Sequence, residues 1–256
     1  MNICLVLFFI LFIVMIAVGG TRGLKSFLTL VFNFIILFTM FILILFKIDP
    51  IKVTIFGCII ISYVTLFFIN GYNVKTYSSL LSVTIVVLIT MLLTYRLGNN
   101  ARIQGFSNEE IDSIQTLSLF VQINFAKIVI CQILIGLLGA IIDVSISISS
   151  SMNELFKSDS LISQKRLFSS GMNIGKDILG TMTNTLLFAF IGEFMALIIL
   201  FNESHYSLAD TLNAKVFCSE VFQILCSGIG IILIIPVTAF ITSKFLSFKS
   251  NSKQVV

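Results

Sequence analysis

Charged residues and proline are scarce in this sequence. Only 11% of its 256 residues are charged and two are proline, whereas 57% are hydrophobic and the mean hydropathy is +1.09. A water-soluble domain usually carries about 25% charged residues, and a single core of this size could not bury so many apolar side chains. The composition therefore excludes a soluble domain and an extended disordered region, and it indicates that the lipid bilayer is part of the solvent.

Residues typical of metal, nucleotide and nucleophile sites are also few. There is one histidine, and the formal net charge is only +4, which gives no reason to expect a nucleic-acid partner. The sequence contains no HExxH motif, no Gly-rich phosphate loop and no G-x-S-x-G nucleophile motif. All five cysteines lie in apolar runs without forming a C-x-x-C pair, which favours buried apolar roles. We expect no metal, no cofactor and no enzymatic activity.

Seven apolar runs approach or exceed the length of about 20 residues that a membrane-spanning helix needs. They are residues 2–18, 26–46, 53–68, 76–95, 128–149, 173–201 and 216–245. No Lys or Arg precedes the first run, so we expect it to remain as a helix and not to act as a cleaved signal. The sequence predicts an all-α, polytopic bundle of about seven spans.

The basic residues predict how this bundle is oriented. Nine Lys and Arg lie on one side of the spans, at positions 22, 25, 75, 157, 165, 166, 244, 249 and 253, and five lie on the other, at positions 47, 52, 96, 102 and 215. Basic loops stay cytoplasmic. We therefore expect the N-terminus outside and the C-terminus inside.

We divide the chain into four regions. Residues 1–96 form a four-helix membrane scaffold, 97–127 a linker, 128–245 a three-span bundle with the polar motifs, and 246–256 a cytoplasmic tail. In the linker, Ser107 and Glu110 fit a capping box, which predicts that a helix starts there. That helix either lies along the membrane surface or simply extends the fifth span.

The carboxylates are concentrated in the last three spans. Residues 1–95 contain one acid, Asp49, whereas Asp143, Asp177 and Glu193 lie inside apolar runs and Glu220 lies near the start of one. An ionisable side chain at mid-membrane costs a few kcal/mol, so each needs a partner, a water-filled cavity or a function.

Small and polar residues form one stripe on the fifth span and another on the sixth. The fifth-span stripe contains Gln132, Gly136, Gly139, Ala140, Asp143, Ser147 and Ser150. On the sixth span Asp177, Thr181 and Asn184 share a face, and Gly171, Gly175 and Gly180 keep the helix slim. We expect the two stripes to pack against each other, with the glycines and Ala140 allowing close approach.

Asp143 and Asp177 are predicted to lie at similar depth, because each is a few residues from the cytoplasmic end of its run. Two close carboxylates could share a proton or bind a cation. Asp143, Asp177, Thr181, Asn184 and Ser147 are therefore candidates for an ion or substrate path. Alternatively, the carboxylates only hydrogen-bond the helices together.

The last span contains Gly228, Gly230 and Pro236, each able to bend a membrane helix. A simple kink at Gly230 and Pro236 is one interpretation. A broken helix at a transport site is the other.

Two stretches, GLLGAIIDVSISISSSMNE at 136–154 and SGMNIGKDILGTMTNTL at 170–186, resemble the core of the YibE/F family of bacterial membrane proteins. The resemblance extends from about Gly105 to Pro236, and the chain departs from the pattern at Lys176, Glu193 and 226–228. It implies a multi-pass protein of the bacterial cytoplasmic membrane, in the short form without an extracytoplasmic domain. It also implies assembly with a longer YibE/F paralogue, or as a homo-oligomer.

These observations lead to two main functional hypotheses. The first is a permease-type component with a proton- or cation-binding site between spans 5 and 6. The second is a non-transporting scaffold that assembles with a larger paralogue. An intramembrane enzyme is a third, because paired aspartates can activate water, but no substrate-binding motif accompanies them.

Overall fold

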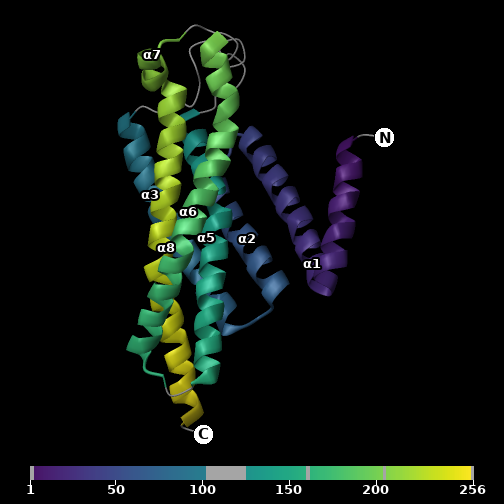
Figure 1. Cartoon of the computed structure of the whole chain (residues 1–256), viewed down its shortest axis with the longest axis vertical. Helices are drawn as coiled ribbons and strands as arrows, with labels where there is room; N and C mark the ends of the chain where they lie inside the picture. Colours follow the sequence, from purple (N-terminus) through teal and green to yellow (C-terminus); the bar gives the residue numbers. More distant parts are fainter. Residues whose placement is uncertain (1–2, 102–124, 160–161, 204–205, 255–256) are drawn as a thin grey trace.

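The chain forms an all-α bundle in the computed structural model, which describes residues 3–101, 125–159, 162–203 and 206–254 (Figure 1). Six long helices and one short helix account for nearly all of these residues. They are α1 Ile3–Leu45, α2 Pro50–Asn70, α3 Val74–Ala101, α5 Phe125–Ser158, α6 Gln164–Glu203, α7 Leu208–Asn213 and α8 Lys215–Gln254. The predicted linker helix near Ser107 lies outside the described residues.

The first long helix, α1, is a hairpin of two arms. Its backbone leaves helical geometry at Gly20, where φ is 54° and ψ is −132°. Such a positive φ suits glycine, which has no Cβ to clash. The turn is also tight at Gly23, where a Cβ would overlap the Met15 carbonyl oxygen. The two arms correspond to the predicted first and second spans, and the first arm stands apart from the bundle (Figure 1).

Local signals set the ends of α2 and α7. The α2 helix starts at Pro50, with the Asp49 side chain accepting a hydrogen bond from the Ile51 backbone N–H, and Gly71 caps its end at a φ of 71°. Ser207 and Asp210 form a capping box that starts α7.

Five helices, α1, α2, α3, α5 and α8, are long and apolar enough to cross a membrane. The sixth long helix, α6, packs along α5 and α8. The two arms of α1, together with α2, α3, α5, α6 and α8, coincide with the seven predicted apolar runs, but α6 is not among the five helices that meet the requirement for crossing a membrane. The termini lie towards opposite ends of the bundle (Figure 1).

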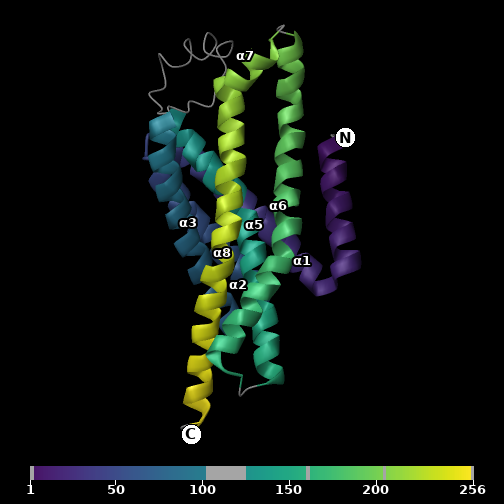
Figure 2. The same ribbon diagram turned by 60° about the vertical axis from the view of Figure 1, so that its left-hand side comes forward.

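The core of the bundle is made by α3, α5 and α8. In two views α8 lies between α3 and α6 (Figures 1 and 2), and α3 also packs on α5. The predicted boundary at residue 96 therefore does not separate two packing units, because α3, from the N-terminal region, fills the centre of the bundle. The predicted tail is helical as far as Gln254, as a continuation of α8.

Candidate functional site

The polar stripe of α5 faces outward. Gln132, Gly136, Gly139, Asp143 and Ser147 share one side of the helix, and all five are exposed. The opposite side carries the fully buried residues Ile133, Leu137, Ile141 and Ile148. The predicted stripe therefore does not form the packed side of α5, which consists mainly of large aliphatic side chains.

The polar face of α6 is also exposed. Asp177, Thr181 and Asn184 lie on the side of α6 that points away from its packed residues. Gly175 lies on the packed side, where a Cβ would overlap the side chain of Ile235 on α8. The hydroxyl of Thr181 donates to its own helix, to the Ile178 carbonyl oxygen, at 2.8 Å.

The predicted contact between the two stripes is absent from the described part of a single chain. The helices α5 and α6 do approach each other near their linked ends, where a Cβ at Gly171 would meet the Met152 sulfur at 2.5 Å, and again where a Cβ at Gly136 would lie 3.9 Å from Phe190. Asp143 and Asp177 lie about 22 and 20 Å from the ends that the 159–163 segment joins. The two carboxylates are thus at nearly the same depth, on surfaces that the described part of the chain leaves exposed.

The predicted packing positions divide into two groups. Gly175 is at a close helix contact, but with α8 and not with the stripe of the fifth span. By contrast, a Cβ built at Gly139 or Gly180 meets no atom of the described chain within 4 Å, and Ala140 is only half-buried. Within the described part of one chain, Gly139 and Gly180 therefore make no close contact with a neighbouring helix. Gly136 is intermediate, because its Cβ would lie 3.6 Å from the amide nitrogen of Gln223.

The last span is one continuous helix through Gly228, Gly230 and Pro236. A broken helix at this position is therefore not present. Gly230 is a packing residue, because its Cβ would lie 3.4 Å from Leu137 of α5 and from Thr90 of α3. Pro236 leaves the carbonyl oxygen of Ile232 without its usual helical donor.

A buried seam of hydroxyl groups joins α3, α5 and α8. The Oγ atoms of Ser79 and Ser149 share a hydrogen bond of 2.6 Å, and Thr238 donates to Ser145 Oγ at 3.0 Å. Ser145 itself donates weakly to the Ser79 carbonyl oxygen at 3.4 Å. A further bond runs from the Thr242 hydroxyl to Ser78 Oγ, at 3.1 Å. All of these side chains are buried.

Sequence reasoning missed this hydroxyl seam. Its signal is a run of Ser and Thr at helical spacing in α3, at positions 78, 79, 82, 90 and 94, all of which are buried. None of these residues carries a charge, so the pattern of carboxylates does not mark this face. On α5 the predicted stripe runs through Ser147, whereas Ser145 and Ser149 make the contacts.

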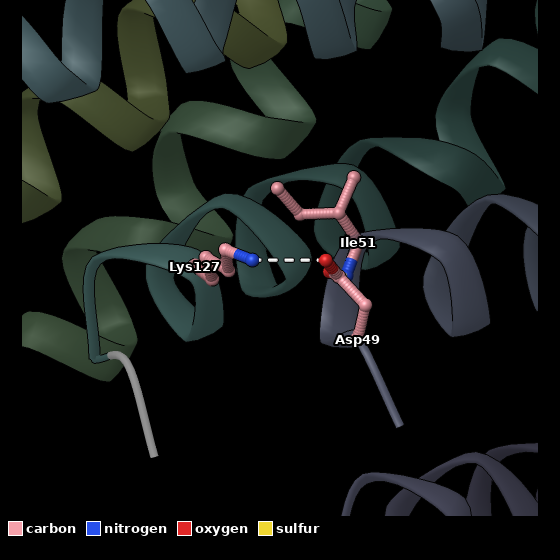
Figure 3. Close-up of polar contacts among 3 residues, drawn as sticks. All are labelled: Asp49, Ile51 and Lys127. Carbon is pink, nitrogen blue, oxygen red and sulfur yellow. Dashed lines mark hydrogen bonds and ion pairs between the residues drawn. The ribbon is translucent and has the colours of Figure 1, made fainter. Parts of the chain in front are cut away.

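An ion pair closes one end of the bundle. Lys127 of α5 lies 2.9 Å from the carboxylate of Asp49, which also accepts the Ile51 N–H (Figure 3). The hydrogen bond from the Lys127 ammonium is the main cause of the lowered pKa of Asp49; burial opposes it, and the Ile51 N–H and the charge of Lys52 add smaller lowering effects. Asp49, the single acidic residue among the first 95, thus links the start of α2 to α5 through an ion pair.

No metal cluster occurs among the described residues, since no three His, Cys, Asp or Glu side chains converge there. Cys58, Cys131 and Cys226 are buried as expected, whereas Cys4 and Cys218 are exposed, and all five are free thiols. The side chain of Glu193 lies outside the described part of the structure.

The model of the YibE/F-like protein family matches residues 7–248. The chain belongs to the YibE/F-like family. The match covers nearly the whole sequence, including the first hundred residues, where the motifs had given no signal. No curated protein and no solved structure matches the chain. The family assignment therefore fixes the architecture, and any activity must be inferred from the site.

Proposed function

We propose that this YibE/F-like protein is a permease-type membrane component that works as an assembly of subunits. In the assembly, the polar faces of α5 and α6 contact a second copy of the chain. Asp143 and Asp177 form the proton- or cation-binding site of the permease at this contact. The proposal rests on the exposure of Asp143 on α5, a candidate membrane span, and of Asp177 on α6, which packs along it.

The energetic reason is the cost of leaving these faces in lipid. A carboxylate at the centre of a membrane helix costs about 2.5–3.5 kcal/mol on insertion scales. Two such residues, together with Thr181 and Asn184, would find hydrogen-bonding partners on another subunit, and Gly139 and Gly180 would let its backbone come close. A second copy is proposed because most soluble oligomers pair identical chains; a longer family member is the other possible occupant.

Contact with a second copy can be tested by cysteine cross-linking. Ser147→Cys and Thr181→Cys, each in a Cys4→Ser, Cys218→Ser background, should form disulfide-linked or short-linker dimers in membranes. Ile232→Cys is the matched control, because Ile232 is 55% exposed on a different helix. Equal cross-linking at all three positions would argue against a specific contact.

The alternative function is a non-transporting scaffold. It would bind its partner through the same polar faces of α5 and α6, but it would not need Asp143 or Asp177 to gain or lose a proton. Asn keeps the size of Asp and its hydrogen-bonding capacity but cannot ionise. Asp143→Asn and Asp177→Asn should therefore leave the subunit abundant and assembled while abolishing proton or cation flux in proteoliposomes. Truncation to Ala should weaken assembly as well, because it leaves partner groups unsatisfied. Full activity of both abundant Asn variants would favour the scaffold.

We further propose that the protein lies in the bacterial cytoplasmic membrane with its N-terminus outside. The nine-to-five distribution of basic residues and the opposite positions of the termini support this orientation (Figure 1). A reporter fused after Val256 should be active only if it works in the cytoplasm. Activity of a reporter that works only outside the cytoplasm, fused at the same position, would contradict the proposed orientation.

A further inference from the structure

A cavity of about 600 Å³ lies between α1, α5, α6 and α8. Its volume falls within the range of about 300–1,000 Å³ that is usual for small-molecule sites. The second arm of α1 comes closest to the bundle at its C-terminal end (Figure 1), where Leu37, Met40 and Ile44 form one wall. The α5 and α6 helices form the others, with Phe190 among the lining residues.

The cavity is mostly apolar but contains two primary amides. Gln132 of α5 and Gln223 of α8 line it, and none of the described lining residues is charged. Gln223 lies 8 residues into α8 and Gln132 lies 7 residues into α5. Both amides are therefore about 10–12 Å along their helices from the same end of the bundle, within the membrane-spanning segments.

Gln223 is the unusual residue. The residue is only 5% exposed, but its amide is not among the fully enclosed polar atoms without a partner, so the amide opens into the cavity, where it forms no hydrogen bond with a described residue. Its amide nitrogen lies over Gly136, 3.6 Å from where a Cβ would stand. Buried side-chain amides are normally hydrogen-bonded. Because Gly136 has no side chain, the space next to this amide is open to a ligand atom. A larger residue at position 136 would fill that space.

We propose that this cavity binds an uncharged, lipophilic carbonyl compound taken from the bilayer, of the chemical class of the quinones. The amide N–H groups of Gln223 and Gln132, which lies one turn from Gly136, donate to the carbonyl oxygens. The aliphatic and aromatic walls cover the ring and the start of a hydrocarbon chain. A charged headgroup has no counter-ion among the described lining residues, and a plain acyl chain would leave both amides unpaired.

The site can be tested on the purified full chain in phosphatidylcholine nanodiscs with an azido-benzoquinone that carries a short alkyl chain. Photolabelling should modify the segments around Gln132 and Gln223. An unlabelled alkyl benzoquinone should compete at about tenfold lower concentration than an alkylbenzene of equal chain length, because only the quinone accepts hydrogen bonds. Equal competition by the two compounds would overturn the proposal, since it would identify a merely apolar void.

Two variants test the residues separately. Gln223→Met keeps the length of the side chain and removes its donor, and should reduce labelling about fivefold. Gly136→Leu fills the cavity and should abolish labelling. Gly228→Leu is the matched control on α8, because a Cβ there meets no described atom within 4 Å. Elution on gel filtration shows which variants are folded, and undiminished labelling of folded Gln223→Met would overturn the proposal.

The cavity shares Gln132 and Gly136 with the polar face of α5, but it includes neither Asp143 and Ser147 nor the polar face of α6. Quinone labelling should therefore remain intact in Asp143→Asn. Loss of labelling in this folded variant would contradict a cavity site that is separate from the carboxylates. The cavity proposal and the permease proposal can therefore fail separately.

Discussion

Serine residues two positions apart on α5 have opposite environments. Ser145 and Ser149 are buried against α3 and α8, where they hydrogen-bond to Thr238 and Ser79. Ser147, between them, is exposed on the same side as Asp143. A polar residue in a membrane helix can thus either join the helices of one chain or mark a surface for another molecule, and the residue type does not reveal which.

The largest effect on folding should come from glycines that lie on the packed side. Gly175→Leu should destabilise the chain by about 3 kcal/mol, because even a Cβ at this position overlaps Ile235 of α8. Gly180→Leu is the control on the same helix and should change stability by less than about 0.5 kcal/mol. Unfolding of the detergent-solubilised chain measures both. Equal losses would mean that the packed and open sides of α6 have been wrongly assigned.

Replacing the buried Ser145 and the exposed Ser147 should change the free energy of unfolding by different amounts, both smaller than the effect of Gly175→Leu. Ser145→Ala removes a buried hydroxyl that accepts from Thr238, so we expect a loss of about 1–2 kcal/mol. Ser147→Ala should leave the stability of the isolated chain unchanged while weakening the proposed contact between copies. The same unfolding measurement, together with cross-linking yield in membranes, separates these effects.

The hydroxyl seam should show measurable coupling between helices. A double-mutant cycle of Ser145→Ala and Thr238→Val should give a coupling energy of about 0.6 kcal/mol, the average for hydrogen bonds between membrane helices. Ser147→Ala with Thr238→Val serves as the reference cycle and should give none. Additive effects in both cycles would remove the energetic distinction between the two sides of α5.

The smallest effect should come from the ion pair at the end of the bundle. The pKa of Asp49 is lowered in the folded chain, so at acidic pH the unfolded chain binds more protons at this group. Its contribution to stability is therefore present above the ordinary pKa of about 3.9 and is lost as the pH falls below it. Because the pair is partly exposed and screened by solvent, we expect a smaller effect than that of the hydroxyl seam.

Lys127→Met should reduce this acid-dependent loss, because the Lys127 ammonium is the largest cause of the lowered pKa. Melting temperatures measured from pH 6 to pH 3 would show the change. Lys52→Met is the control, since Lys52 makes the smallest contribution. An unchanged pH dependence in Lys127→Met would show that the ion pair does not persist in the membrane.

Much of the architecture was predictable from sequence. The seven apolar runs coincide with the two arms of α1 and with α2, α3, α5, α6 and α8, and five of these helices are long and apolar enough to cross a bilayer. The turn chemistry at Gly20 and Gly71 and the cap at Asp49 are equally local. Motif resemblance also identified the family, which the match over residues 7–248 confirms.

Part of the candidate site was predictable as well. The spacing of Gln132, Gly136, Asp143 and Ser147 correctly places them on one side of a helix, as does that of Asp177, Thr181 and Asn184. Their near-equal depth follows from the short 159–163 connection. The unpaired amide of Gln223 was not predictable, since the cavity depends on four helices that are distant in sequence.

The sequence by itself determined which residues cross the membrane and which share a helix face, because both follow from the geometry of one helix. Only the tertiary structure decided which face of α5 and of α6 points inward. Lipid and protein interior are both apolar, so hydropathy does not separate them as it separates core from water. Packing decides which face points inward. The side of α5 that carries aliphatic side chains such as Ile141 is buried in the bundle with α3 and α8, and Asp143 lies on the exposed side.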